Sequence, residues 1–407
     1  MVRSLRRWAL AGSIMFTGLA GAAGLGTGGC GGGGGRSKQT EDLAAKQKRE
    51  RQARLVQKAQ ASAKSGDVDA ADTQYGKAFG IAQEVDILHE HVMFLIASGR
   101  ATRAAEVAKA YYDTNTTDAA GYELYAEALL AGNEGNKAYD VANQLVKFDD
   151  KRPVGYEKRG RAQVQRGNAE DGITDLQHAV ELAPDEPRYH TQLGLAFYSL
   201  KRYGEAAIEL SAAQKKTPDD SMANALLGMA RRDQGFDDDA KTSLDRAVEL
   251  DKRNGRAWFE LGLLYNRQEK QTDAEDALAK AVQLSPYESR FWYAYGEIYR
   301  VQQRDDEAIA AYKRAIELDP PNPKVLPKLV GLYLDHDQVA DADEALTAAM
   351  GRFPELPSNW LAAGMLYQAQ KKKKPALEAY TKFLSLAAPA DPERARATEA
   401  ITALKKR

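Results

Sequence analysis

The chain has 407 residues, of which 43% are hydrophobic and 28% charged, a composition that suits a soluble, helix-rich protein. Lys and Arg number 57 against 58 for Asp and Glu, which excludes the strong basic excess typical of nucleic-acid-binding proteins. The single cysteine excludes an internal disulfide.

The first 30 residues are predicted to be an export signal. Arg3, Arg6 and Arg7 precede an uncharged, weakly apolar run over residues 8–23, which is the order found in secretory signal peptides. Because this run is shorter than the roughly 20 apolar residues that cross a bilayer, a permanent membrane helix is disfavoured.

The small residues at 26–29 are followed by Cys30, and the segment resembles the lipobox of bacterial lipoproteins. The resemblance implies that Cys30 is lipidated and becomes the first residue of an outer-membrane lipoprotein that faces the periplasm. Thr27 stands where such boxes usually carry Leu. The alternative is ordinary cleavage after Ala22 or Ala23, which would leave a soluble periplasmic protein.

Residues 31–51 begin with five glycines and continue as polar chain. Glycine-rich segments behave as flexible coils. We therefore expect a tether that joins Cys30 to the folded part of the protein.

A 34-residue period dominates the rest of the chain, and seven consecutive units over 153–390 keep it without insertion. Small residues fill one column and proline recurs between units, where it ends one helix and can open the next. A further column is glycine in six units: Gly160, Gly194, Gly228, Gly262, Gly296 and Gly364.

These columns resemble the tetratricopeptide repeat (TPR). In the unit at 255–288 the matching residues are Trp258, Leu261, Gly262, Tyr265, Ala274, Leu278, Ala281 and Pro286. The resemblance implies an all-α, right-handed superhelical solenoid of about ten helical hairpins, because a single hairpin cannot cover its own apolar face. The repeats are placed at about 52–84, 85–118, 119–152, 153–186, 187–220, 221–254, 255–288, 289–322, 323–356 and 357–390, followed by a polar capping helix at 391–407.

No sequence motif indicates catalysis, and we predict neither an enzyme nor a cofactor or metal site. The chain has no phosphate-binding loop. His89 and His91 lie two residues apart, whereas a zinc protease would need a second histidine where the chain has Met93. On a helix, side chains two positions apart do not face each other.

In TPR proteins the first helix of each hairpin lines the concave face, with positions 2, 5, 9 and 12 of each repeat pointing into it. The resemblance thereby implies a partner-binding groove over 188–300 that mixes arginines with aromatic and aliphatic side chains, a composition that favours interface hot spots. Its residues are Arg188, Leu195, Tyr198, Met222, Met229, Arg232, Arg256, Phe259, Leu263, Asn266, Arg290, Tyr293 and Arg300. The alternative is that these side chains pack against adjacent helices or line a solvated channel.

The function expected from these patterns is that of an exported, lipid-anchored scaffold or adaptor. It would bind proteins or peptides in its concave groove and assist the assembly of a secretin, pilus or motility complex in the cell envelope. The alternative is a glycan-binding or cell-wall-binding regulatory subunit of an envelope complex. We expect no nucleic-acid partner. Four lysines at 371–374 fit either a solvated loop or contact with anionic lipid or an acidic partner.

Overall fold

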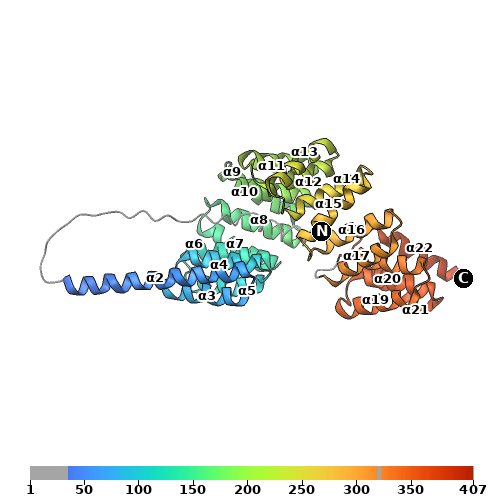
Figure 1. Cartoon of the computed structure of the whole chain (residues 1–407), viewed down its shortest axis with the longest axis horizontal. Coiled ribbons are helices and arrows are strands. Elements are labelled where there is room, and N and C mark those ends of the chain that lie inside the picture. The colour runs from blue at the N-terminus through green and yellow to red at the C-terminus, as the bar shows by residue number, and fades with distance from the viewer. Residues whose placement is uncertain (1–34, 319–321, 407) are drawn as a thin grey trace. The chain divides into compact units, whose positions relative to one another are not determined.

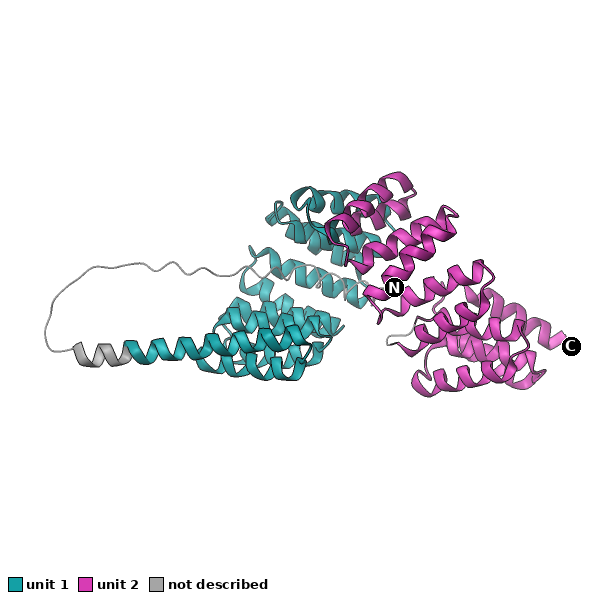
Figure 2. Ribbon diagram, viewed as in Figure 1, with its two compact units in different colours: residues 1–223 teal, residues 224–407 magenta. Residues whose placement is uncertain are grey.

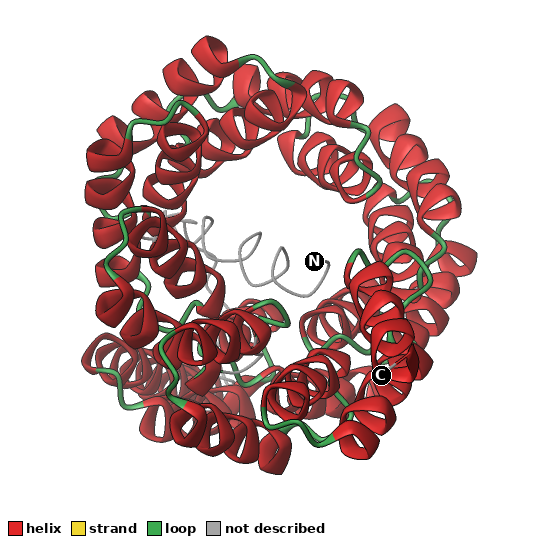
Figure 3. Ribbon diagram, turned by 90° about the vertical axis from the view of Figure 1, so that its right-hand side faces the viewer, coloured by secondary structure: helices red, strands yellow, loops and turns green. Residues whose placement is uncertain are grey.

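The computed structural model describes residues 35–318 and 322–406, and all regular secondary structure in those ranges is helical (Figure 1). The chain divides into two compact units, residues 1–223 and 224–407, which are described separately below (Figure 2). The sequence-based prediction of an all-α fold is confirmed, since helices and their connecting loops account for the described chain (Figure 3).

The helices of the first unit pair as antiparallel hairpins that follow the 34-residue period. They are α2 (Gly35–Ser65), α3 (Val68–Ala82), α4 (Val85–Ala97), α5 (Ala101–Thr114), α6 (Ala119–Ala131), α7 (Gly135–Phe148), α8 (Pro153–Arg166), α9 (Ala169–Leu182), α10 (Pro187–Ser199) and α11 (Tyr203–Lys216).

The boundary between the units falls within α12 (Ser221–Gln234). The second unit continues the same pairing with α13 (Asp237–Leu250), α14 (Gly255–Arg267), α15 (Gln271–Leu284), α16 (Ser289–Val301), α17 (Asp305–Glu317), α18 (Val325–Asp335), α19 (Val339–Arg352), α20 (Pro357–Ala369), α21 (Lys373–Leu386) and α22 (Glu393–Lys406).

The glycine column marks places where the two helices of a hairpin touch. A Cβ atom added to Gly262 of α14 would lie 2.6 Å from Cγ of Leu278 on α15. On α16, a Cβ atom at Gly296 would lie 2.7 Å from the ring of Tyr312. Any side chain at these positions would force the helices apart, which explains the recurrence of glycine.

Each hairpin turns at a residue in the left-handed conformation, and these residues recur every 34 positions. They are Gly99, Asn133, Gly167, Lys201, Gly235, Glu269, Gln303, Asp337 and Lys371. After Gly167 the amide of Asn168 donates to the carbonyl of Gln163 at 3.0 Å, the closing bond of a Schellman motif. Six of the nine turns use a residue other than glycine, so composition alone does not reveal this column.

The segment expected to be a flexible tether is instead largely helical. Helix α2 begins at Gly35, and its residues from 42 to 51 are all exposed, beyond the helices that it joins (Figure 1). Packing begins at Gln52, which is 3% exposed, and continues at Ala59. The reason is composition, since residues 44–54 are Ala, Lys, Gln, Arg and Glu, which have high helix propensity.

Cys30 and the predicted export signal lie outside the described residues. Among the described residues, no helix is long and apolar enough to cross a membrane.

Helix α22 covers the end of the second unit. Ala397 is fully buried against α20 and α21. Nη1 of Arg394 donates to the carbonyls of Leu384 and Ala387 at 2.7 and 2.9 Å. These carbonyls lie at the C-terminus of α21, where the helix leaves its acceptors unsatisfied.

Candidate partner-binding surface

In the second unit a single buried carboxylate lies among three arginines. Glu260 of α14 is 1% exposed, and its Oε2 accepts a hydrogen bond from Nη1 of Arg232 at 2.5 Å. Its Oε1 lies 3.5 Å from Nη2 of Arg256 and 3.8 Å from Nη2 of Arg290. We call these four residues the Glu260 cluster. Because it holds three cations and one anion, part of its positive charge is left uncompensated within the cluster.

The arginines keep Glu260 ionised. Burial acts to raise the pKa of this carboxyl, but attraction to Arg232, Arg256 and Arg290 outweighs it and holds the pKa below its usual value. A carboxylate in this state accepts hydrogen bonds and does not act as a proton donor near neutral pH. The Glu260 cluster is therefore suited to binding and orientation.

Two stacked phenylalanines support the cluster. The rings of Phe259 and Phe291 lie parallel with centroids 4.3 Å apart, and the guanidinium of Arg290 covers the Phe259 ring at 4.5 Å. Nη2 of Arg256 also donates to Sδ of Met229 at 2.8 Å. The aromatic pair fixes the plane of the Arg290 guanidinium, as expected for cation–π contacts.

Arg290 is the arginine of the cluster that reaches the surface. Its side chain is 28% exposed, against 0% for Arg256 and 9% for Arg232. Its Nε and Nη2 atoms are buried and have no hydrogen-bond acceptor among the described residues. The guanidinium can therefore accommodate an acidic group from outside.

Arg290 continues into a partly exposed strip on the same helix. Tyr293, Glu297 and Arg300 follow it at intervals of three or four residues, which places all four on one side of α16. We call these four residues the α16 face. Burial, with Glu297 nearby, raises the pKa of Tyr293 to about 12, so its hydroxyl stays neutral.

Glu297 is the anionic member of the α16 face, and cations surround it. It accepts a hydrogen bond from the Tyr312 hydroxyl and pairs with Nε of Arg300 at 3.4 Å. Nζ of Lys328 lies 3.5 Å from the same carboxylate. The α16 face thus mixes one aromatic ring and two arginines with a carboxylate that is already paired.

The first unit contains a related ionic cluster. Arg161 Nη1 lies 2.7 Å from Oε2 of Glu127 and 2.8 Å from Oε1 of Glu157, and Lys158 contacts both carboxylates. At its edge, Nη2 of Arg188 lies 3.7 Å from Oε2 of Glu157. Burial acts to raise the pKa of both carboxyls, but the neighbouring cations lower it. Arg188 occupies the same repeat position as Arg290, and its side chain is 45% exposed.

The structure divides the predicted groove residues into buried and accessible sets. Met229, Arg232, Arg256 and Phe259 are at most 7% exposed, so they support the surface from beneath, as the packing alternative described. In the second unit, Leu263, Asn266, Arg290 and Tyr293 are partly exposed and Arg300 is exposed. In the first unit, Leu195, Tyr198 and Met222 are partly exposed and Arg188 is exposed. Their role in binding remains a prediction.

Sequence reasoning missed Glu260 and the carboxylates of the first unit, which organise both clusters. A usable signal exists for Glu260: Arg256 lies four residues earlier on the same helix and Arg290 lies 34 residues later. A pairing rule for neighbours one turn apart would have identified the first contact. Only the stacking of repeats brings the other two arginines to it.

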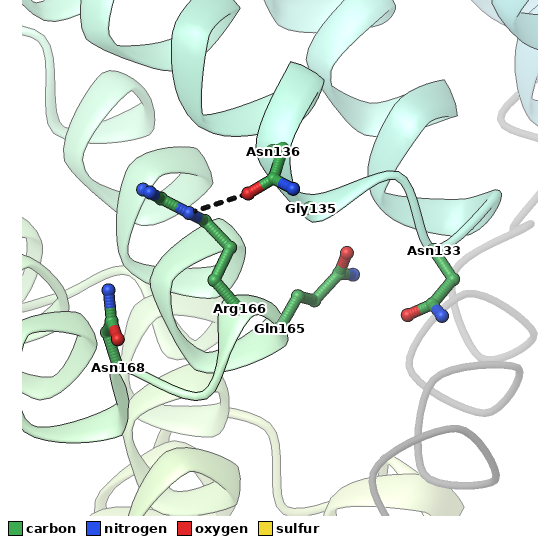
Figure 4. A pocket seen from close by; sticks show the side chains of 6 residues that line it. All are labelled: Asn133, Gly135, Asn136, Gln165, Arg166 and Asn168. Atoms are coloured by element: carbon green, nitrogen blue, oxygen red, sulfur yellow. Dashed lines mark hydrogen bonds between the residues drawn. The ribbon is translucent and has the colours of Figure 1, made fainter.

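A polar pocket of about 360 Å³ lies in the first unit, at the turns of two successive hairpins (Figure 4). Nε of Arg166 donates to Oδ1 of Asn136 at 2.9 Å, and Nε2 of Gln165 donates to the carbonyl of Leu130 at 2.9 Å. The pocket is lined by Asn133, Gly135, Asn136, Gln165, Arg166 and Asn168. Amides and one guanidinium can bind a polar ligand, but the lining offers no general acid or base.

The histidines noted in the sequence do not form a metal site. His91 is 1% exposed, and its Nε2 lies 2.7 Å from Oδ1 of Asp72. Glu90 accepts hydrogen bonds from Tyr75 and Gln60. Over residues 35–318 and 322–406, no three His, Cys, Asp or Glu side chains are grouped so that they could hold a metal ion.

Comparison with known families identifies the repeat. Family models of the tetratricopeptide repeat match residues 157–221, 226–289, 289–322 and 357–389. No curated protein matches the sequence.

Solved structures share the fold at low sequence identity. The APC/C hetero-tetramer Cut9–Hcn1 matches with a TM-score of 0.55 and 15% identity, over 83% of this chain and 59% of the other, so this chain spans less than two thirds of it. Yeast Tom70 matches with a TM-score of 0.55 and 14% identity, over 88% of this chain and 96% of the other. The human IFIT1 dimer with PPP-AAAA matches with a TM-score of 0.53 and 15% identity, over 87% and 88%. At such identities the likeness shows the fold alone.

Proposed function

We propose that this chain, which is a tetratricopeptide-repeat protein, is an exported, lipid-anchored adaptor that holds partner proteins on the first helices of its repeats. The α16 face carries the proposal, because it presents Arg290, Tyr293 and Arg300 on a rigid helix. Arginine and tyrosine dominate binding hot spots. We therefore expect a protein or peptide partner.

The electrostatics of the α16 face favour an acidic segment in that partner. Arg290 shares Glu260 with two other arginines that lie closer to it, and its buried Nε and Nη2 lack acceptors. A partner carboxylate would supply an acceptor for Arg290. Glu297 is already paired and would not oppose this contact strongly.

The biological setting remains part of the proposal. The leader and Cys30 support export and anchoring to the outer membrane on the periplasmic side. A repeat scaffold near that membrane would suit the assembly of a secretin, pilus or motility complex. Mass spectrometry of the mature N-terminal peptide tests the anchor: acyl chains on Cys30 are expected, with loss of membrane association in Cys30→Ser. An unmodified N-terminus after Ala22 or Ala23 would contradict it.

Partner binding is tested by affinity purification of the tagged chain from detergent-solubilised membranes. Tyr293→Ala combined with Arg300→Ala should abolish recovery of partners that the unaltered chain retains. The control combines Tyr287→Ala, at a residue that is 72% exposed, with Arg314→Ala, neither of which lies on the α16 face. Equal recovery by both variants would contradict the proposal. Phe259→Ala is unsuitable, because it would open a cavity in the core.

The polar pocket is the observation that favours the alternative of a glycan-binding subunit. Its amides could bind hydroxyl groups. The nearby Tyr139 ring is covered by the Arg166 guanidinium at 4.4 Å, so no aromatic face is open there for a sugar to stack on. Binding of peptidoglycan fragments that is lost in Asn136→Ala would support this alternative.

We propose no nucleic-acid partner. Residues 59–407 contain 46 Lys and Arg against 55 Asp and Glu, and an acidic body repels phosphate backbones. The IFIT1 structure contains PPP-AAAA, so an electrophoretic shift assay with single-stranded RNA is the appropriate check.

A further inference from the structure

We propose that the exposed half of α2 is a basic stalk that binds the surface of an anionic phospholipid membrane. This inference rests on the proposed function, because it supposes that the chain reaches a membrane. It adds a second contact that does not depend on the acyl anchor. The stalk is defined here as residues 42–58 of α2.

The charge of the protein is strongly divided along the chain. Residues 36–58 contain eight Lys and Arg and three Asp and Glu, whereas residues 59–407 contain 46 and 55. The segment around the stalk is therefore net positive by five charges and the remainder net negative by nine. An anionic surface would attract the first and repel the second, which would hold the repeats away from the membrane.

The basic side chains of the stalk are available for binding. They are Lys46, Lys48, Arg49, Arg51, Arg54 and Lys58, and all six are exposed. None of them forms an ion pair with another residue in the described part of the chain. Elsewhere basic side chains commonly pair with acids of a neighbouring repeat, as Arg152 does with Glu123 at 2.7 Å.

The helix gathers part of this charge on one side. Lys48, Arg51, Arg54 and Lys58 follow one another at intervals of three or four residues, which places them along a single stripe. The side of α2 that packs on the repeats begins at Gln52 and includes Ala59. The stalk thus presents its basic stripe to the exterior while its later part is held by the fold.

A membrane is the occupant that the position of the stalk favours. The segment follows the apolar leader and Cys30 by fewer than 20 residues. Clusters of four to eight Lys and Arg next to a membrane anchor bind anionic headgroups at about 1 kcal/mol for each basic residue. A single acyl chain gives only marginal attachment, so a basic stalk would strengthen it.

Vesicle co-sedimentation tests the inference with the chain from residue 31 onward, which retains every described helix and lacks Cys30. Vesicles of equal parts phosphatidylglycerol and phosphatidylcholine should bind it, and pure phosphatidylcholine vesicles should not. Lys48→Glu, Arg51→Glu and Arg54→Glu together should reduce affinity for the anionic vesicles on the order of 100-fold. High salt should reduce it as well, because it screens surface charge.

The matched control reverses the same number of charges in the other lysine cluster. Lys372→Glu, Lys373→Glu and Lys374→Glu, at exposed residues, should leave vesicle binding unchanged. Equal loss in both variants, equal binding to neutral vesicles, or binding only to an acidic polypeptide or RNA would overturn the proposal. Since Cys30 is absent, failure here leaves the lipid anchor untouched, and an unmodified Cys30 in cells would leave this result standing.

Discussion

Arg256 and Glu260 lie one turn apart on α14, with Nη2 of the arginine 3.5 Å from Oε1 of the glutamate, and both side chains are at most 1% exposed. Burying two charges in this way rarely stabilises a protein relative to an apolar pair, whereas removing one partner is strongly destabilising. The pair therefore suits a role in positioning Arg290 better than a role in stability.

Glu260→Gln is expected to lower the free energy of unfolding by about 3–5 kcal/mol, because it leaves three arginines without their shared carboxylate. Urea denaturation followed by circular dichroism measures the change. The control is Glu249→Gln, an exposed residue paired with Arg246 at 3.6 Å, for which a change within about 0.5 kcal/mol is expected.

The effect of Glu260→Gln should also depend on pH. The folded-state pKa of Glu260 is below its ordinary value of 4.5, so its contribution is fully present above that pH and is lost as pH falls through the folded-state pKa. The difference between variant and unaltered chain should therefore shrink in acid. A difference that is absent at neutral pH would contradict the described cluster.

Gly262→Ala is expected to lower the free energy of unfolding by about 1–3 kcal/mol, because the new methyl group would overlap Leu278. Thermal denaturation measures the shift. Gly80→Ala is the control, since its Cβ would meet nothing within 4 Å in the interior of α3. That variant should gain about 0.5–1 kcal/mol from helix propensity. Destabilisation of similar size in both would show that crowding is not the cause.

Gly167→Ala isolates backbone strain from crowding. A Cβ at Gly167 would meet nothing within 4 Å, but φ is +90°. The left-handed conformation costs a residue with a side chain about 1–2 kcal/mol, so destabilisation of that size is expected by urea denaturation. A variant as stable as the unaltered chain would mean that the turn can adopt another conformation.

His91 should make the first unit sensitive to mild acid. Burial lowers its pKa, and the hydrogen bond with Asp72 opposes this only in part, with Arg103 acting alongside burial. As pH falls below the ordinary value of 6.5, the unfolded chain gains a proton before the folded one does. The free energy of unfolding should then fall by up to about 1.4 kcal/mol per pH unit.

Urea midpoints measured above and below that pH test this sensitivity. His91→Gln should remove the slope, whereas His178→Gln, whose side chain is 44% exposed, should leave it in place. A slope that survives His91→Gln would place the sensitive group elsewhere.

The fold was predictable because its determinants are local and repeated. Gly262 and Leu278 sit 16 residues apart in the same hairpin, and the same crowding recurs at Gly228 and Leu244. The start of α2 was not predicted correctly, because the run of glycines suggested a coil whereas the following Lys, Arg and Glu residues favour a helix.

The candidate surface was predictable only in part. Positions 2 and 5 of the repeat correctly included Arg290 and Tyr293 as partly exposed residues. The same rule also selected Arg256 and Phe259, which are buried, because burial depends on the neighbouring repeat. The meeting of Arg232, Arg256 and Arg290 at Glu260 requires three successive repeats in register, which one sequence does not specify.

Site-specific photo-crosslinking in intact cells tests the central claim most directly. A benzophenone amino acid at position 293, on the α16 face, should give a discrete crosslinked protein that is absent when the same group replaces Tyr287. Arg290→Glu should abolish the product while leaving the circular dichroism spectrum unchanged. The same products from both positions, or none from position 293, would contradict a partner-binding role for the α16 face.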